Sequence, residues 1–297
     1  MTDKQKKPKW FRAIRSMQVS NFNIIQSIFF RIWMFSSLKI ANFAARLFFY
    51  HTKKQELYDY QSNVFERLGL NYLEAKNLAN KVCQELFGST FNNSNGMHSE
   101  HLVYFSALKL SGFKPKNILE IGTFKGETSS FIAKLFPDSM IRTLDISIKE
   151  MKEKNIYLYA VNSKEDLNYH RMKNFKDFNN ISFNELNSLL LTYESNEYDL
   201  IWLDGAHGYP IATVDLTNSL RLLSKNGKLV CDDVYLTIRK EDSNYFSLAL
   251  IETLNSFKSV KAISFELVLK RVDFNFNFWK NQKKYIAIVK NEKVNHL

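Results

Sequence analysis

The stretch that decides the fold is ILEIGTFKGETSSFIA, residues 118–133. It begins with a short apolar run typical of a buried strand, continues into a turn that contains Gly122 and Gly126, and ends in a helical segment. The two glycines permit a tight turn and the close approach of a ligand to the backbone. The helix that follows presents free amides at its N-terminus, which favours an anionic group. The loop is not GxGxxG, so a dinucleotide site is the weaker interpretation.

Apolar segments that predict further strands recur along the chain. The predicted strands are 116–122, 140–146, 180–185, 198–205 and 227–234, followed by a closing antiparallel pair over 262–272 and 283–291. Their alternation with helical segments predicts an α/β fold, a doubly wound, seven-stranded, mostly parallel sheet with an N-terminal helical extension. Ligands bind outside the carboxyl ends of the strands in such sheets, so we expect the functional residues there.

Composition and charge divide the chain unevenly. Its 297 residues are 45% hydrophobic, which is enough for one large α/β domain with additional elements. Residues 1–54 contain 11 Lys or Arg and one acid, whereas the remainder carries 30 basic and 29 acidic residues. A nearly neutral body argues against a nucleic-acid partner. The two cysteines, Cys83 and Cys231, argue against a disulfide framework and favour a reducing, cytoplasmic compartment.

Three parts are predicted: a basic amphipathic segment over 1–54, a helical cap region over 55–112 and a sheet domain over 113–297. Charged residues interrupt the apolar stretch of the first part too often for a transmembrane helix, and no signal-peptide cleavage site is evident. Two interpretations stay open for it. It lies on an anionic membrane surface, or it packs as an amphipathic helix on its own domain or on a second subunit of a homo-oligomer.

Acidic residues stand at the ends of three of the predicted strands. Asp145 ends the second strand, where a carboxylate can accept both hydroxyls of a ribose. Asp204 ends the fourth strand, and Asp232 and Asp233 end the fifth. Converging carboxylates repel one another unless they share a cation or protons, and oxygen-only ligands suit Mg²⁺. His207 follows Asp204 by three residues, and its ordinary pKa of about 6.5 suits a general base. Each of these residues, taken singly, is equally explained as a solvated acid or a loop histidine.

Three blocks together resemble a known family: residues 118–133, RTLDI at 142–146, and YDLIWLDGAHGYPIATVDLTNSLRLLSKNGKLVCDDV at 198–234. They are similar to class I S-adenosylmethionine-dependent methyltransferases. More narrowly, they resemble the metal-dependent O-methyltransferases of the catechol and macrolide-sugar (macrocin, mycinamicin) type. The resemblance covers roughly residues 95–290 and implies that 113–297 is an S-adenosylmethionine-binding catalytic domain.

The resemblance also implies a set of cofactor-binding residues. Those around the methionine part of S-adenosylmethionine are Glu120, Gly122, Thr123, Phe124, Gly126 and Thr128. Asp145 is expected at the ribose, Asn187 and Ser188 near the adenine, and Met97 and His98 where relatives cover the cofactor. His98 and His101 lie three residues apart on a predicted helix, and two surface histidines are favoured there over a metal pair.

For catalysis, His207 stands at the D-x-x-H position of the base in the macrolide-sugar enzymes. Asp204, Asp232 and Asp233 are the implied ligands of Mg²⁺ or another divalent cation. The expected function is O-methyl transfer to a hydroxyl of a sugar, glycan or secondary metabolite, at a membrane surface if residues 1–54 bind one. The alternative is a non-catalytic, membrane-associated protein that binds S-adenosylmethionine and serves as a partner subunit.

Overall fold

A computed structural model describes residues 52, 54–91, 98–153, 164–238, 247–272 and 283–292. The chain forms two units, residues 1–53 and 54–297, and all described residues except Thr52 belong to the second. The predicted basic segment therefore lies outside the described residues, apart from Thr52 and Lys54. Among the helices of the described residues, none combines the length and the hydrophobicity that a membrane span requires.

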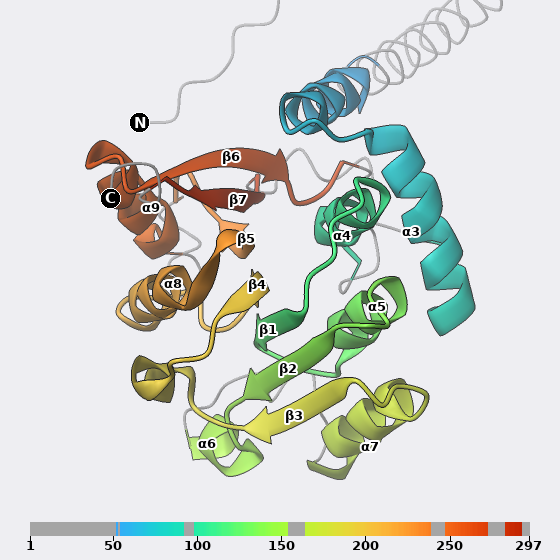
Figure 1. Ribbon diagram of the computed structural model, residues 1–297, viewed down its shortest axis with the longest axis vertical. Coiled ribbons are helices and arrows are strands. Elements are labelled where there is room, and N and C mark those ends of the chain that lie inside the picture. The colour runs from blue at the N-terminus through green and yellow to red at the C-terminus, as the bar shows by residue number, and fades with distance from the viewer. Residues whose placement is uncertain are drawn as a thin grey trace, which may run out of the picture. The chain divides into compact units, whose positions relative to one another are not determined.

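A seven-stranded sheet forms the centre of the second unit, with the strand order β3-β2-β1-β4-β5-β7-β6 (Figure 1). The strands are β1 (Asn117–Ile121), β2 (Met140–Asp145), β3 (Ile181–Glu185), β4 (Tyr198–Leu203), β5 (Leu223–Val234), β6 (Ile263–Leu269) and β7 (Tyr285–Asn291). The first five pair in parallel, and β7 runs antiparallel to both β5 and β6. The predicted doubly wound sheet and its closing antiparallel pair are confirmed.

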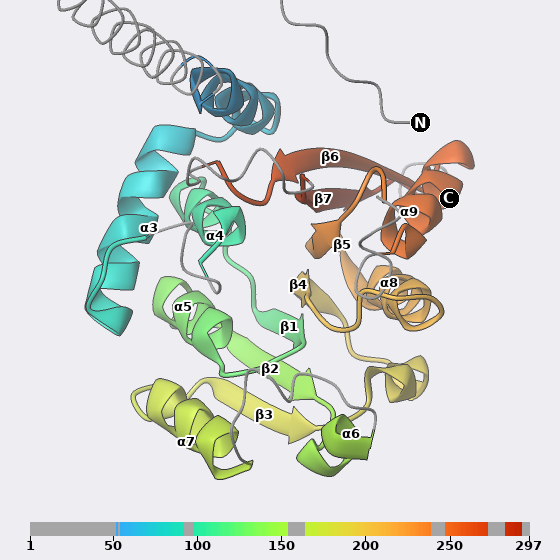
Figure 2. The same ribbon diagram turned by 180° about the vertical axis from the view of Figure 1, so that it is seen from behind.

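Helices cover both faces of this sheet (Figures 1 and 2). One face carries α3 (Tyr72–Phe87), α4 (Glu100–Leu110), α5 (Glu127–Leu135) and α7 (Lys164–Phe175), and the other carries α8 (Ile211–Leu222) and α9 (Ala249–Ser259). Because side chains alternate along a strand, Ile118 and Trp202 belong to the core under the first group. Leu119 and Ile201 belong to the core under the second.

A helix over residues 54–67 protects the edge strand β6. The side-chain oxygen of Gln61 accepts from the amide of Leu269 at 3.0 Å, and its amide group donates to the carbonyl of Leu269 at 3.3 Å. The hydroxyl of Tyr60 donates to the carbonyl of Leu267 at 2.8 Å. These bonds satisfy backbone groups that an open sheet edge would expose.

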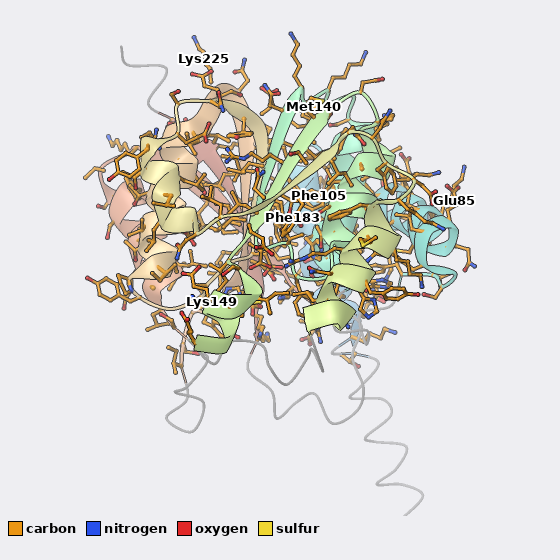
Figure 3. The ribbon with its side chains drawn as sticks, turned by 90° about the horizontal axis from the view of Figure 1, so that it is seen from below. Glu85, Phe105, Met140, Lys149, Phe183 and Lys225 are labelled. Atoms are coloured by element: carbon orange, nitrogen blue, oxygen red, sulfur yellow. The ribbon has the colours of Figure 1, made fainter. Side chains whose placement is uncertain are left out.

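The carboxyl ends of the parallel strands meet at one edge of the sheet. The short helix α6 (Ile148–Glu153) follows the end of β2, and the 3₁₀ helix η1 (Ser188–Tyr193) follows β3. In Figure 3, Lys149 of α6 lies at this edge, whereas Met140, at the start of β2, and Lys225 lie at the opposite edge. Phe105 and Phe183 lie between them in the interior of the view. The candidate functional residues are thus gathered at the edge marked by Lys149.

Candidate active site

The loop between β1 and α5 packs directly on the end of β4. Gly122 has φ +101, and a Cβ atom at this position would stand 2.2 Å from the carbonyl oxygen of Asp204. Gly126, the N-cap of α5, has φ +79, and a Cβ atom there would stand 2.4 Å from the ring of Phe175. Gly122 is therefore required by close approach to the backbone of Asp204 as well as by conformation, and Gly126 by its positive φ. The contact of Gly122 with Asp204 joins the predicted cofactor loop to the predicted catalytic turn.

Asp145, at the end of β2, is held by the same loop. Its carboxylate accepts from the amide of Phe124 at 2.9 Å, from the amide of Ile146 at 2.9 Å and from the guanidinium of Arg171 at 2.9 Å. Phe124 has a left-handed backbone, φ 45, which turns its amide toward Asp145. Burial raises the pKa of Asp145, while Arg171 opposes that shift. The predicted ribose acceptor thus stands beside the loop, with part of its hydrogen-bonding capacity used.

Arg171 of α7 was not predicted as a site residue. Its Nε donates to the carbonyl of Phe124 at 2.6 Å, and its guanidinium stacks 4.4 Å from the centre of the Phe183 ring. Within the described residues, its Nη1 is buried with no hydrogen-bond partner. The segment between β2 and β3 carries no motif of a known site, so no local signal connected Arg171 with Asp145.

Glu120 is buried on the face under α5. The hydroxyl of Thr143 donates to its carboxylate at 2.5 Å, Ser129 donates to the same oxygen, and the hydroxyls of Thr123 and Thr143 lie 2.7 Å apart. Burial raises the pKa of Glu120 to about 7, and the two hydroxyl donors oppose that shift. Glu120 and Thr123 thus tie β1, β2 and α5 together directly beneath the loop.

The two histidines before and within α4 are buried, so the expectation of surface histidines was wrong. His98 is 2% exposed and stacks on Phe91, and His101 is 3% exposed and stacks on Trp202 at 4.6 Å between ring centres. Burial lowers the pKa of His101 to about 3, so its ring is neutral. Its Nε2 lies 3.4 Å from the hydroxyl of Thr128. His101 therefore reaches a predicted cofactor residue, whereas Met97 lies outside the described residues.

The two residues that were predicted near the adenine lie at the start of η1. The Asn187 side chain accepts from the amide of Leu189 at 3.1 Å and donates to Glu150 of α6 at 2.8 Å. Ser188, the first residue of η1, is buried, with 7% of its surface exposed. Asn187 therefore links the end of β3 to α6, a partner that its sequence context did not indicate.

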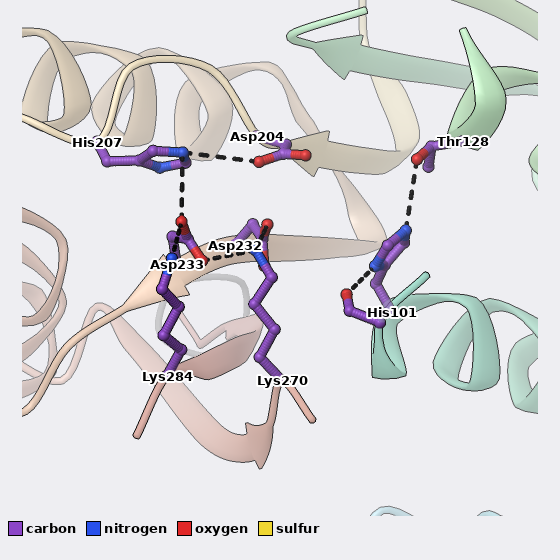
Figure 4. A network of polar contacts seen from close by, with 9 residues as sticks. His101, Thr128, Asp204, His207, Asp232, Asp233, Lys270 and Lys284 are labelled. Atoms are coloured by element: carbon purple, nitrogen blue, oxygen red, sulfur yellow. Dashed lines mark hydrogen bonds and ion pairs between the residues drawn. The ribbon is translucent and has the colours of Figure 1, made fainter. Parts of the chain in front are cut away.

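The four predicted catalytic and metal residues converge, as Figure 4 shows. Nε2 of His207 lies 3.8 Å from Oδ1 of Asp204 and 3.7 Å from Oδ2 of Asp233. Both separations exceed a normal hydrogen bond. Asp232 is 3% exposed in its side chain, Asp233 is 12% exposed and His207 is 19% exposed. The site is therefore an enclosed acidic corner with a neutral histidine at its rim.

Two adjacent carboxylates reach this corner because β5 is irregular there. Asp233 has a left-handed backbone, φ 48, and the pairing of β5 with β7 shifts register between Cys231 and Val234. In a regular strand, successive side chains point to opposite faces. A bulge at the end of a strand re-aims a side chain, so Asp232 and Asp233 meet the same partner.

Residues 119–234 match a family described as "Methyltransferase domain". This part of the chain is therefore a methyltransferase domain. The match spans the β1 loop, Asp145, His207 and both acids of β5, so the methyltransferase predicted from the sequence is confirmed.

Solved structures of methyltransferases are similar in fold. The O-methyltransferase TomG of Streptomyces achromogenes, in complex with SAM, is 14% identical over 78% of this chain and 97% of its own, with a TM-score of 0.45. The methyltransferase PaMTH1 of Podospora anserina is 19% identical over 73% of this chain and 88% of its own, with a TM-score of 0.46. The N-methyltransferase NodS of Bradyrhizobium japonicum is 17% identical over 74% of this chain and 97% of its own, with a TM-score of 0.46. Among curated proteins, no sequence matches the chain.

Two lysines that sequence reasoning missed enter the acidic corner of the methyltransferase domain. Nζ of Lys270 lies 2.5 Å from Oδ2 of Asp232 and 2.6 Å from Oδ1 of Asp233. Nζ of Lys284 lies 2.8 Å from Oδ2 of Asp233. They approach from the side of β6 and β7, opposite His207 and Asp204 (Figure 4).

Burial and these charges set the protonation of the corner. Burial raises the pKa of Asp204 well above its ordinary value, and the neighbouring Asp232 adds to that shift. Burial also acts to raise the pKa of Asp233, but Lys270, His207 and Lys284 outweigh it and hold that pKa below the ordinary value. Burial lowers the pKa of His207, which keeps its imidazole neutral. Within the described residues, no group of three or more His, Cys, Asp or Glu side chains is arranged to hold a metal ion.

Proposed function

We propose that this chain transfers a methyl group from S-adenosylmethionine to a hydroxyl oxygen. The observation that carries the proposal is the contact between Gly122 and Asp204, where a Cβ would stand only 2.2 Å from the carbonyl oxygen. It joins the loop expected to bind the cofactor to the turn that carries His207. The methyl group of a cofactor bound at the loop and the imidazole of His207 on the turn would then reach the same hydroxyl oxygen of the substrate.

The cofactor would bind along the carboxyl ends of β1, β2 and β3. Thr128, in the first turn of α5, is proposed near the methionine carboxylate, where the amides at the helix N-terminus favour an anion. Asp145 is proposed at the ribose and the Asn187–Ser188 pair near the adenine. The remaining members of the proposed set form or support the loop: Glu120, Gly122, Thr123, Phe124 and Gly126, with Met97 and His98 as a cover.

In the proposed reaction, His207 takes the hydroxyl proton on Nε2 as the acceptor oxygen forms its bond to the methyl carbon. S-adenosylmethionine supplies that methyl group from a sulfonium centre, and S-adenosylhomocysteine leaves with the bonding electron pair. A lowered pKa suits His207 to this role, since the neutral imidazole is the base. Asp233, whose lowered pKa keeps it ionised 3.7 Å from Nε2, stabilises the imidazolium that forms.

The divalent cation expected from the resemblance does not fit the corner in this arrangement. The acids Asp204, Asp232 and Asp233 are hard oxygen donors of the kind that Mg²⁺ prefers. However, ammonium groups already hold both oxygens of Asp233 and one of Asp232. A metal ion placed among these carboxylates would adjoin two like charges. No step of the proposed reaction therefore uses a metal ion.

The acceptor is proposed as a small molecule or glycan with a free hydroxyl, of the sugar or secondary-metabolite class. Residues 1–54 are proposed to bring the catalytic unit to an anionic membrane surface. The second candidate, a non-catalytic S-adenosylmethionine-binding partner protein, is disfavoured by the convergence of His207 with the acids of β4 and β5.

The test combines cofactor binding with turnover. Calorimetry with S-adenosylmethionine is expected to show binding to the wild type and to His207→Asn, and weakened binding to Asp145→Asn. Release of S-adenosylhomocysteine is then screened against sugars, glycans and polyketide-like alcohols, and His207→Asn is expected to bind cofactor without turnover. Cofactor binding with no turnover of any hydroxyl acceptor by the wild type would favour the partner protein. Absence of cofactor binding would refute both candidates.

A further inference from the structure

The ammonium of Lys270 occupies a built position at the centre of the acidic corner. Its side chain is 12% exposed, with Nζ at 2.5 Å from Asp232 and 2.6 Å from Asp233. The backbone is held on both sides, since its amide donates to the carbonyl of Lys284 and its carbonyl accepts from the amide of Glu100, each at 3.0 Å. A surface lysine has neither this burial nor this anchoring, so the position of Nζ is set by the fold.

Lys284 completes the same arrangement. Its Nζ lies 2.8 Å from the second oxygen of Asp233, so the two ammonium groups together bring two positive charges to the carboxylates. That is the charge of one divalent cation. The carboxylates of Asp232 and Asp233, which would repel each other alone, are paired with ammonium groups in place of metal coordination.

The Lys270 ammonium also keeps hydrogen-bonding capacity. An ammonium has three N–H donors, and two of them are directed to Asp232 and Asp233. Among the described residues, the third has no hydrogen-bond partner. Across the corner, Nε2 of His207 lies 3.7 Å from Asp233 with no shorter polar contact in the described part of the chain. An acceptor oxygen bound between these two side chains would meet a hydrogen-bond donor on one side and a proton acceptor on the other.

We propose that Lys270, supported by Lys284, is the resident cation of this acceptor site and takes the place of a divalent metal ion. The role toward the acceptor rests on the proposed function: the free N–H of Lys270 would bind the acceptor oxygen and favour its deprotonation by His207. The acceptor class that follows is a neutral or anionic hydroxyl compound, because a cationic one would be repelled by Lys270.

The experiment that tests the replacement needs no acceptor. Mn²⁺ is titrated into the full-length protein and followed by electron paramagnetic resonance, with thermal unfolding as a second readout. The wild type is expected to bind no Mn²⁺ at the corner up to the low millimolar range. Lys270→Met is expected to bind Mn²⁺ about tenfold more tightly or better, since it removes a positive charge from the corner and frees an oxygen on each acid. Lys225→Met, an exposed lysine at the opposite edge of the sheet (Figure 3), is the matched control and is expected to behave as the wild type.

Two results would overturn the proposal. One is wild-type binding of Mn²⁺ that Asp233→Asn abolishes, since Lys270 would then yield to a metal ion. The other is a folded Lys270→Met that gains no affinity for Mn²⁺. If Lys270→Met does not fold, Lys270→Ala is the second variant, with added methylammonium to replace the lost ammonium group. The Mn²⁺ titration of the wild type tests the proposal without any variant. Cofactor binding and turnover are measured separately from the Mn²⁺ titration. The titration therefore still tests the role of Lys270 if the proposed function proves wrong.

Discussion

Gly122→Ala tests the contact on which the active site depends. Two effects act against an alanine there. The backbone at φ +101 is strained for any residue with a Cβ, at a cost of about 1–2 kcal/mol. The new Cβ would also stand 2.2 Å from the carbonyl oxygen and 2.6 Å from the carbonyl carbon of Asp204, both backbone atoms that no rotamer change can move. Overpacking of this kind costs about 1–3 kcal/mol.

Gly112→Ala is the matched control. Gly112 also has a positive φ, +79, but a Cβ there would meet no atom within 4 Å. It therefore measures backbone strain alone, about 1–2 kcal/mol. We expect Gly122→Ala to lower the free energy of unfolding by about 2–5 kcal/mol in total. For a domain of this size, each kcal/mol lowers Tm by about 2–4 °C.

The collision has a second consequence that the control lacks. Relieving it moves the Asp204 backbone by about 1 Å, and a misplacement of that size costs about 100-fold in rate. Urea unfolding and S-adenosylhomocysteine release are the two assays. If Gly122→Ala matches Gly112→Ala in unfolding free energy and retains wild-type turnover, then β1 and β4 do not touch as described and the active-site assignment loses its basis.

Three further outcomes are expected. Burial raises the pKa of Glu120 from 4.5 to about 7 in the folded chain. Protonation of Glu120 therefore contributes stability that is complete below about pH 4.5 and is lost as the pH rises through 7. Glu120→Gln should lack this part of the pH dependence of the free energy of unfolding in urea. Trp202 is fully buried and stacks on His101 at 4.6 Å, so Trp202→Ala should cost about 3–5 kcal/mol by the same assay, and a cost near zero would contradict the described core. Cys83 is buried with a pKa raised by burial to about 12, so a thiol reagent at pH 8 should label it only as fast as the chain opens, and rapid labelling of the native protein would contradict its burial.

Much of the fold could be predicted because its signals are local. A run such as that of β1 carries its own strand pattern, and Gly122 and Gly126 mark the turn within a few residues. The expectation that functional residues end the strands then followed from a general property of parallel sheets. The structure brings His207 within 4 Å of Asp204 and of Asp233, although Asp233 lies 26 residues further along the chain.

What the sequence could not decide is which charged side chains complete the corner. Lys270 and Lys284 stand 37 and 51 residues beyond Asp233, in segments that were predicted only as the closing antiparallel pair of strands. The antiparallel return of β7 between β5 and β6 brings both ammonium groups to the acids, and the left-handed backbone of Asp233 turns its side chain to receive them.

The amino-acid sequence by itself determined the strands, the glycine loop, the methyltransferase family and the acids at the strand ends, because these depend on neighbours along the chain. Only the tertiary structure decided that His98 and His101 are buried, that Arg171 holds Asp145, and that two ammonium groups stand where a metal ion was expected. Each of those depends on pairing between distant segments, and the free energy of a buried charge is set by partners that no local pattern records.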